Sequence, residues 1–331
     1  MWNILNPDKI IRNEVSVLDA LVTGAGGFVG NYLVQELLHY HAHVGATKLP
    51  KEYIKCKNCD ILDMDLTKEY EVRKILELYK PAQIYHLAAQ SSVAVSWTDP
   101  DLTIDVNMKG TLHLLNAVRS IENYTPRILL VGSSEEYGYL ENTCPVNEQA
   151  TLHPANIYAV TKVCQNMIGN IYAKAYGMDV LMVRAFNHIG VGQSPVFVAS
   201  DFVLQIAEIE AGLRAPLMRV GNLEAKRDFS DVRDIVRAYR LLMQNGHTGE
   251  TYNVGSGSAV AIQELLSILL GLSTESIIVE QDAAKMRPAE IACIQADIQK
   301  LQAHTGWKPE FTLEETLQTM LYHERRNFGI L

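Results

Sequence analysis

Short apolar runs alternate with longer amphipathic stretches through the first two-thirds of the chain. Residues 20–23 (ALVT), 83–87 (QIYHL) and 127–131 (RILLV) have the length and the side chains of buried strands. Residues 30–40 and 155–176 instead carry apolar side chains at helical spacing. The further strands that we expect are 43–47 and 180–183, and the further helices are 67–79 and 101–120. Strands that alternate with helices predict parallel βαβ units, whose sheet has helices on both faces.

The pattern changes from about Pro195 onward. The helices expected there are 197–212, 231–245, 261–270 and 313–326. Short strands and loops that contain glycine or proline separate these helices. We interpret this part of the chain as a smaller α/β lobe that packs on the edge of the sheet.

The composition is that of a globular protein without an extended anionic partner. The 331 residues include 29 Lys and Arg against 38 Asp and Glu, a net charge of −9, which argues against nucleic-acid binding. No run reaches the ~18 apolar residues of a membrane span, and the N-terminal residues lack a signal-peptide core. We therefore expect a cytoplasmic protein that does not bind membranes. Five cysteines suit a reducing compartment, and the histidines lack metal-ligand spacing, so no metal site is expected.

A glycine-rich turn follows the first strand. Gly24, Gly27 and Gly30 form a G-x-x-G-x-x-G pattern, whereas Val29 takes the last position of the more familiar G-x-G-x-x-G. Glycines permit a tight turn and a close approach of the backbone to a pyrophosphate, and the helix that follows adds amide donors. The placement between a strand and a helix predicts a dinucleotide site.

The alternation and the glycine turn together predict the α/β fold class, with a Rossmann-like, doubly wound parallel sheet and a smaller C-terminal α/β lobe. We assign residues 15–194 to an NAD(P)-binding domain, to which a strand and a helix from about 231–260 are added. Residues 195–331 would mainly form the substrate lobe.

The end of the second strand favours one of the two nicotinamide cofactors. An Asp or Glu there binds the free ribose hydroxyls of NAD, whereas a basic residue accommodates the 2′-phosphate of NADP. The segment GATKLP (45–50) has no acid and places Thr47 and Lys48 at its tip. It therefore predicts NADP, with NAD as the alternative.

A candidate proton-transfer site lies on the helix 155–176. Tyr158 and Lys162 are four residues apart, so they share one face of that helix. An ammonium beside a phenol lowers the pKa of the phenol from its usual ~10, and the tyrosine can then exchange a proton near neutral pH. Ser133 and Ser134 end the preceding strand, where a hydroxyl could reach the same substrate oxygen.

With these motifs the chain resembles the extended short-chain dehydrogenases/reductases that modify nucleotide sugars. The resemblance extends from about Ala20 to Trp307. The segments that carry it are TGAGGFVG (23–30), Asp65-Leu66, HLAAQSSV (86–93), DVNMKGT (105–111), SSEEYG (133–138), Tyr158 with Lys162, and RAFNHIG (184–190).

This resemblance implies roles for particular residues. Ser133, Tyr158 and Lys162 would be the catalytic trio, supported by Asn107. The cofactor would contact Gly24, Gly27, Phe28, Val29, Gly30, Thr47, Lys48, Asp65, Leu66, Leu87, Ala88, Ala89 and Asn107 besides Tyr158 and Lys162, with Asp65 and Leu66 beside the adenine. Ser91, Ser92 and Glu135 would lie at the substrate.

The C-terminal half is similar to the GDP-mannose branch of this family. The similar segments are GNLEAKRDFSDVRDIVRAY (221–239), YNVGSG (252–257) and Arg287-Pro288-x-Glu290. Within that branch FNHIGVGQ (186–193) most resembles GDP-6-deoxy-4-keto-D-mannose reductases, which form GDP-D-rhamnose. Arginines bind a diphosphate through bidentate, charge-assisted bonds. The residues that we assign to the GDP-sugar are Arg227 with Arg219 or Arg287, together with Asn187 and Glu290.

Two reactions compete on this scaffold. A 4-reductase transfers a hydride from NADPH to the C4 ketone while Tyr158 donates a proton. A 4,6-dehydratase also needs a carboxylate that removes the C5 proton, and Glu135 stands where the dehydratases of this family place that glutamate. The segment after His188, the short chain and Ser133 in place of threonine favour reduction. GDP-mannose 4,6-dehydratase or a related epimerase is the alternative, a non-catalytic dinucleotide-sensing protein is the remote one, and a UDP or CDP base stays open.

The expected partners are the GDP-sugar substrate and a second copy of the chain. In related enzymes two helices that correspond to 101–120 and 156–176 form a four-helix dimer interface. The resemblance therefore implies a homodimer, with a tetramer as the alternative.

Overall fold

A seven-stranded parallel sheet forms the centre of the larger half of the protein in the computed structural model, which describes residues 17–54, 56, 58–139, 144–285 and 292–331. Its strands are β1 (Ala20–Thr23), β2 (Val44–Lys48), β3 (Asp60–Asp63), β4 (Gln83–His86), β5 (Arg127–Ser133), β6 (Val180–Ala185) and β10 (Thr251–Val254). Their spatial order is β10-β6-β5-β4-β1-β2-β3, and each neighbouring pair is parallel. The expected doubly wound parallel sheet is confirmed.

Helices cover both faces of this sheet. They are α1 (Phe28–Leu38), α2 (Glu69–Tyr79), α3 (Val93–Thr98), α4 (Pro100–Ile104), α5 (Gly110–Ser120), α6 (Ile157–Tyr176), α8 (Val232–Asn245) and α10 (Gln299–Thr305), with the short turns η2 (Asp105–Lys109) and η3 (Ser134–Glu136). Apolar side chains of α1, α8 and α10 form one buried cluster with the strands, and those of α2, α5 and α6 form another. Burial of these two apolar faces is the main favourable contribution to the stability of the layers.

The helix expected over 101–120 differs from the observed structure. It is divided into α4, the π-helical turn η2 and α5. A π-helical turn adds one residue to the helical hydrogen-bonded ring, and such turns are frequent at functional sites. Here the turn contains Asn107, whose side chain is buried.

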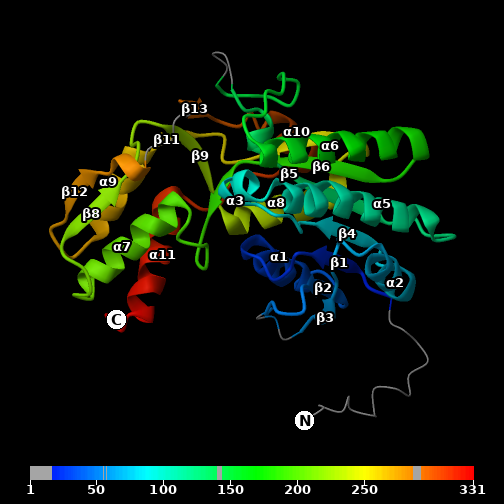
Figure 1. Cartoon of the computed structure of the whole chain (residues 1–331), viewed down its shortest axis with the longest axis horizontal. Helices are drawn as coiled ribbons and strands as arrows, with labels where there is room; N and C mark the ends of the chain where they lie inside the picture. Colours follow the sequence, from blue (N-terminus) through cyan, green and yellow to red (C-terminus); the bar gives the residue numbers. More distant parts are fainter. Residues whose placement is uncertain (1–16, 55, 57, 140–143, 286–291) are drawn as a thin grey trace, which may run out of the picture.

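The smaller lobe lies beside the sheet, as Figure 1 shows. It contains β7 (Asn187–Ile189), α7 (Val198–Glu210), β8 (Leu217–Val220), β9 (Lys226–Asp231), β11 (Ala259–Ala261), α9 (Ile262–Leu272), β12 (Ile278–Gln281), the turn η4 (Ala283–Lys285), β13 (Cys293–Ile294) and α11 (Leu313–Asn327). Apolar side chains of α7, α9 and α11 share one core with β8 and β9. None of the helices in the described part of the chain has the length and apolarity that a membrane span requires.

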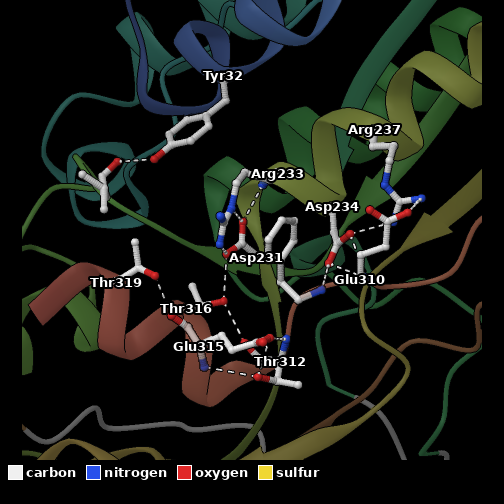
Figure 2. Close-up of polar contacts among 12 residues, drawn as sticks. Tyr32, Asp231, Arg233, Asp234, Arg237, Glu310, Thr312, Glu315, Thr316 and Thr319 are labelled. Carbon is white, nitrogen blue, oxygen red and sulfur yellow. Dashed lines mark hydrogen bonds and ion pairs between the residues drawn. The ribbon is translucent and has the colours of Figure 1, made fainter. Parts of the chain in front are cut away.

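Two aspartates at the start of α8 form hydrogen bonds that connect the smaller lobe to the larger half (Figure 2). Asp231 caps the helix by accepting a hydrogen bond from the Arg233 amide at 2.7 Å, and the hydroxyl of Thr316 in α11 reaches its Oδ2 at 2.8 Å. Asp234 accepts from the amides of Glu310 and Phe311, each at 3.0 Å. Carboxylates are favourable at a helix N-terminus, where the helix dipole is positive.

Candidate active site

The carboxyl ends of β1 and β4 form the topological switch point of the sheet. The chain proceeds from β1 outward through β2 and β3 and then returns to β4 on the other side of β1. Open α/β sheets bind their ligands at such a point. The structure brings the predicted residues together there, because a Cβ at Gly24, after β1, would lie 2.7 Å from the Ala88 Cα, after β4. Leu87 and Ala89 flank Ala88 in the same turn.

The glycine turn fits the pyrophosphate of a dinucleotide. Gly24 has φ +69°, a conformation that side chains other than glycine rarely adopt. A Cβ at Gly30 would lie 2.4 Å from the Gly24 carbonyl oxygen, so the close start of α1 requires glycine. Gly27 is the N-cap, and no described side chain caps α1. The amides of Phe28 and Val29 in the first turn are therefore suited to an anion.

The tip of β2 contains an ion pair that the sequence pattern did not predict. The Lys48 ammonium lies 2.7 Å from Oδ1 of Asp63. The cause is the register of β2 and β3, which places the two residues side by side. Thr47 is buried, and its carbonyl accepts from the Ala25 amide of the glycine turn at 2.9 Å. An acid is thus present at this tip, although it comes from the neighbouring strand.

Asp65 and Leu66 follow β3 along the same edge of the sheet. The Asp65 carboxylate accepts hydrogen bonds from the amide and the hydroxyl of Thr67, at 3.0 Å and 2.7 Å. Leu66 is buried, and a Cβ at Gly110 would lie 3.1 Å from its Cβ. The structure therefore places Leu66 between the edge of the sheet and the start of α5.

Asn107 directs its side chain to Gln90 and Thr161. Its Oδ1 accepts from the Gln90 amide at 2.8 Å, and its Nδ2 donates to the Gln90 carbonyl and the Thr161 hydroxyl, both at 3.0 Å. Thr161 directly precedes Lys162 in α6. Asn107 thus contacts the helix of the lysine through a neighbouring residue and not through the ammonium group.

Ser133, Tyr158 and Lys162 converge at the carboxyl end of β5. Ser133 ends that strand, whereas Tyr158 and Lys162 lie in the first turns of α6. Asn156 starts this helix, because its side chain accepts from the Ala159 amide at 2.8 Å. The Ser133 side chain is close enough to Tyr158 to lower the pKa of the phenol, and the Lys162 ammonium lies 6.0 Å from the centre of the Tyr158 ring.

Burial determines the protonation states of these groups. It raises the pKa of Tyr158, and the nearby Ser133 side chain offsets only part of that effect. It lowers the pKa of Lys162 to about 8. The expectation that the lysine lowers the pKa of the tyrosine is therefore wrong for the protein alone. The reason is that burial has the largest effect on the phenol, while the ammonium donates to the Val131 carbonyl at 2.7 Å and to Gln165 Oε1 at 3.0 Å.

The two glutamates that follow Ser134 have different surroundings. Glu135 Oε2 accepts from Asn156 Nδ2 at 3.1 Å, and its charge raises the pKa of Tyr158. Glu135 is therefore near the tyrosine, as the motif predicted. Glu136 is fully buried and forms an ion pair with Arg184 at 2.9 Å. Nothing in the sequence distinguishes Glu136 from its neighbour, because only the register of β5 and β6 identifies its partner.

The structure brings two of the predicted substrate residues close together. β7 and β9 pair in parallel with Asn187 beside Phe229, so Asn187 and Arg227 share one face, two positions apart. Arg219 lies on β8, in a separate two-stranded sheet, and its side chain is exposed.

The remaining predicted substrate residues are at loops. Ser92 is the N-cap of α3 and accepts from the Val95 amide at 3.2 Å, whereas Ser91 is exposed. Arg287 and Glu290 lie outside the described residues.

Helix α1 also contacts the segment 186–193, which the sequence did not predict. The Tyr32 hydroxyl donates to the Val191 carbonyl at 2.9 Å. The ring of His188 stacks on Phe28, with centroids 6.2 Å apart and planes 9° apart, and burial lowers the pKa of this histidine. Within the described residues no cluster of three or more His, Cys, Asp or Glu could hold a metal ion.

Sequence comparisons place this site among nucleotide-sugar enzymes. Residues 21–320 match the family model of GDP-mannose 4,6 dehydratase. The chain is 35% identical to GDP-6-deoxy-D-mannose reductase of Pseudomonas aeruginosa over 301 residues, which cover 91% of this chain and 95% of that protein. It is 32% identical to GDP-mannose 4,6 dehydratase 2 of Arabidopsis thaliana, over 91% of this chain and 85% of that protein.

Two solved structures have a fold similar to that of this chain. RMD from Pseudomonas aeruginosa complexed with NADPH has a TM-score of 0.82 at 32% identity, over 93% of this chain and 99% of that chain. UDP-glucose 4-epimerase from Thermotoga maritima with UDP-glucose has a TM-score of 0.84 at 25% identity, over 94% and 99%. The expected resemblance and fold are confirmed. The chain belongs to the GDP-mannose 4,6 dehydratase family, within the short-chain dehydrogenases/reductases that modify nucleotide sugars.

Proposed function

We propose that the protein reduces the C4 ketone of GDP-4-keto-6-deoxy-D-mannose with NADPH and forms GDP-D-rhamnose. The observation that carries this choice is the 35% identity to a GDP-6-deoxy-D-mannose reductase along 91% of the chain. The likeness to a structure that holds NADPH supports the cofactor.

The residues at the end of β5 are suited to deliver the proton of this reaction. The chemistry that NADPH supplies when bound is a hydride for C4. Burial keeps the Tyr158 phenol protonated, so Tyr158 can donate its proton to the C4 oxygen as a general acid. The Ser133 hydroxyl would hydrogen-bond the same oxygen, and the charge of Lys162 would stabilise the phenolate that remains. The hydride on carbon and the proton on oxygen together convert the ketone into an alcohol.

Ligand binding would divide between the two halves of the molecule. In this proposal the glycine turn holds the pyrophosphate of the cofactor, and Lys48 meets the 2′-phosphate. Arg227 and Asn187, which share a face of the β7–β9 pair, would bind the diphosphate of the GDP-sugar. The larger half, with β10 and α8, would thus be the cofactor domain, and the rest of the C-terminal part would be the substrate lobe.

One observation favours a second candidate, a GDP-mannose 4,6-dehydratase. Glu135 is close enough to Tyr158 for its charge to raise the pKa of the phenol. A carboxylate beside the tyrosine is the group that could remove the C5 proton during elimination. The family model that matches the chain also has the name of this dehydratase.

A single assay distinguishes the two candidates. The purified protein is incubated with NADPH and GDP-4-keto-6-deoxy-D-mannose, and in parallel with GDP-mannose alone. We expect one NADPH to be oxidised for each GDP-6-deoxyhexose formed in the first reaction. A keto-sugar formed from GDP-mannose without net change in cofactor would overturn the proposal in favour of the dehydratase. UDP- and CDP-linked keto-sugars in the first assay test the choice of base.

We also propose that the protein is a homodimer joined through α6. Val160, Met167 and Ile171 recur at helical spacing on that helix and are 43%, 58% and 57% exposed. Exposed apolar side chains in such a stripe favour contact with a second copy. Light scattering after gel filtration should give the mass of two chains, and Met167→Lys with Ile171→Lys should give one.

A further inference from the structure

Glu136 is a buried charge next to the proposed catalytic residues. Its side chain is 0% exposed, whereas Glu135 is half-buried. An ionised carboxylate loses its hydration on burial, which is costly unless hydrogen bonds and an opposite charge replace it. The partners of Glu136 therefore indicate why this position contains a glutamate.

Each oxygen of Glu136 accepts a hydrogen bond from a different donor. Oε1 accepts from the backbone amide of Ser133 at 3.0 Å, and Oε2 accepts from Nε of Arg184 at 2.9 Å. Strands β5 and β6 pair with Gly132 beside Arg184, so the guanidinium reaches the end of β5. A Cβ at residue 132 would lie 2.2 Å from Glu136 Oε1, so only glycine leaves room for the carboxylate.

A second layer of hydrogen bonds holds the arginine. Arg184 also donates to the Tyr137 hydroxyl at 3.2 Å and to the Glu148 carbonyl at 3.1 Å. The Tyr137 hydroxyl donates in turn to Oδ1 of Asn253 at 2.6 Å. Since Arg184 lies on β6 and Asn253 on β10, the network connects Ser133 to two neighbouring strands.

We infer that Glu136 is a positioning residue for the proposed ketone reduction, which fixes the backbone of Ser133 and so directs the Ser133 hydroxyl to the substrate carbonyl, with Arg184 as the group that holds Glu136. This inference rests on the proposed function, because a role for the Ser133 hydroxyl assumes a carbonyl substrate. It assigns the two consecutive glutamates to different tasks, with Glu135 beside Tyr158 and Glu136 behind Ser133.

The geometry requires a carboxylate and not merely a polar side chain. Both oxygens of Glu136 face N–H donors, and an ionised carboxylate accepts at both. A glutamine accepts through one oxygen only, so its NH₂ group would face either the Ser133 amide or the guanidinium. Burial raises the pKa of Glu136 to about 7, while the charge of Arg184 and the hydrogen bond of the Ser133 amide lower it.

Glu136→Gln tests the inference. We expect kcat to fall ~10–100-fold, the usual effect of a displacement of about 1 Å at a reacting group, while KM and the Kd of NADPH stay within ~3-fold. In a Ser133→Ala background the same substitution should cost less than ~2-fold in kcat, because the group that it displaces is absent. An unchanged kcat, or the same loss in both backgrounds, would overturn the inference.

Amide exchange tests the contact without any substrate. The Ser133 amide, observed in protein labelled with ¹⁵N-serine, should exchange with solvent ~10-fold faster in Glu136→Gln than in the wild type. This result does not depend on the sugar, so it separates a failure of the inference from a failure of the proposed function. An unchanged exchange rate would show that Glu136 does not hold the Ser133 backbone.

Two further variants separate positioning from stability. Glu210→Gln is the matched control, because the side chain of Glu210 is 1% exposed and pairs with Arg325 at 2.6 Å in the smaller lobe. It should lower the melting temperature and leave kcat unchanged.

Glu136→Gln with Arg184→Gln is the rescue variant. In this variant Oε1 of the glutamine at position 184 would lie near the place of the former Nε. It could therefore accept a hydrogen bond from the side-chain NH₂ group of the glutamine at position 136. The kcat of this double variant should exceed that of Glu136→Gln. If the single variant does not fold, the kcat of the double variant can still be compared with that of the wild type. No recovery in a folded double variant would count against the inference.

Discussion

The ammonium group of Lys162 lies 6.0 Å from the centre of the Tyr158 ring and donates its hydrogen bonds to Val131 and Gln165 instead. Tyr158 keeps its proton, because burial raises the pKa of the phenol. Ketone reduction consumes a proton, whereas the oxidation that begins a dehydratase cycle needs a proton acceptor. Tyr158 thus holds the proton that ketone reduction consumes.

Tyr158→Phe removes the proposed proton donor and leaves the ring in place. We expect kcat to fall ~10²–10⁴-fold, the usual share of general acid catalysis, while the Kd of NADPH stays within ~2-fold. Tyr172→Phe is the matched control on the same helix, because the Tyr172 hydroxyl bonds Asn116 at 2.7 Å. Steady-state kinetics and fluorescence titration measure both effects. A near-wild-type rate in Tyr158→Phe would mean that the proton comes from another group.

The pH dependence of the reaction should report Lys162. Burial lowers its pKa to about 8, and the charge of Glu136 acts in the opposite direction. The other titratable groups beside it are Tyr158 and His86, and burial lowers the pKa of His86 to about 3, so that histidine is neutral. The reaction needs Tyr158 and Lys162 protonated, so kcat/KM should fall above pH 8. It also needs Glu136 ionised, and the pKa of that carboxyl is about 7, so kcat/KM should fall separately on the acid side of pH 7.

Lys162→Arg is the check on this assignment. A guanidinium stays charged to a pH above ~12, so the fall at high pH should disappear or move upward even if the rate is lower. An alkaline limb that keeps its midpoint in Lys162→Arg would assign the titration to a different group. The measurement is kcat/KM across the pH range at saturating NADPH.

Glu135→Gln separates the two candidate reactions within one protein. Ketone reduction takes no proton from carbon, so we expect kcat of the reductase to fall by less than ~5-fold. Elimination depends on a carboxylate, so a dehydratase should lose ~10²–10⁴-fold. Glu122→Gln, at an exposed position after α5, controls for the loss of one negative charge. A loss of the larger size in the NADPH assay would place Glu135 in the reductive step itself.

The pattern of apolar residues predicts the large elements well, and it fails where the elements are short or polar. β3 was not expected, because most of its residues are exposed and it has no apolar run. β7 was not expected either, because it has only three residues. The long helix of 101–120 is correct in extent, but periodicity does not reveal the π-helical turn that contains Asn107. Such turns depend on tertiary contacts, here with Gln90 and Thr161.

Only some features of the candidate site could likewise be predicted from the sequence. The glycine turn was predicted from its place between a strand and a helix, whereas Ala88 was assigned to the cofactor only by resemblance to the family. The structure brings Gly24 and Ala88 together, because parallel strands bring their carboxyl ends to one edge. The partners of Lys48 and Glu136 could not be predicted from the sequence, because they depend on the register of neighbouring strands. The pKa of Tyr158 was predicted in the wrong direction, because spacing along a helix gives no measure of burial.

Lys48→Ala tests the preference for NADPH. The Lys48 ammonium lies at the tip of β2 and pairs there with Asp63, so a 2′-phosphate would compete with that carboxylate for the ammonium. Loss of one charge-assisted contact should raise the Kd of NADPH ~10-fold or more and leave the Kd of NADH within ~2-fold. Lys51→Ala, in the exposed loop that follows, is the control for net charge. Equal losses for both cofactors in Lys48→Ala would show that Lys48 does not bind the 2′-phosphate.

Thr316→Val tests the attachment of α11 to the start of α8. The Thr316 hydroxyl is buried and lies 2.8 Å from the Asp231 carboxylate, which Arg233 also contacts (Figure 2). A valine keeps the shape and removes the donor, so the free energy of unfolding should fall by about 1–2 kcal/mol. Thr319→Val, one turn later, removes an exposed hydroxyl that bonds only its own helix at Glu315, and it should cost less than ~0.5 kcal/mol. Urea unfolding of both variants measures the difference. Equal losses would show that the hydrogen bond to Asp231 adds nothing beyond helix propensity, because the two substitutions change that propensity alike.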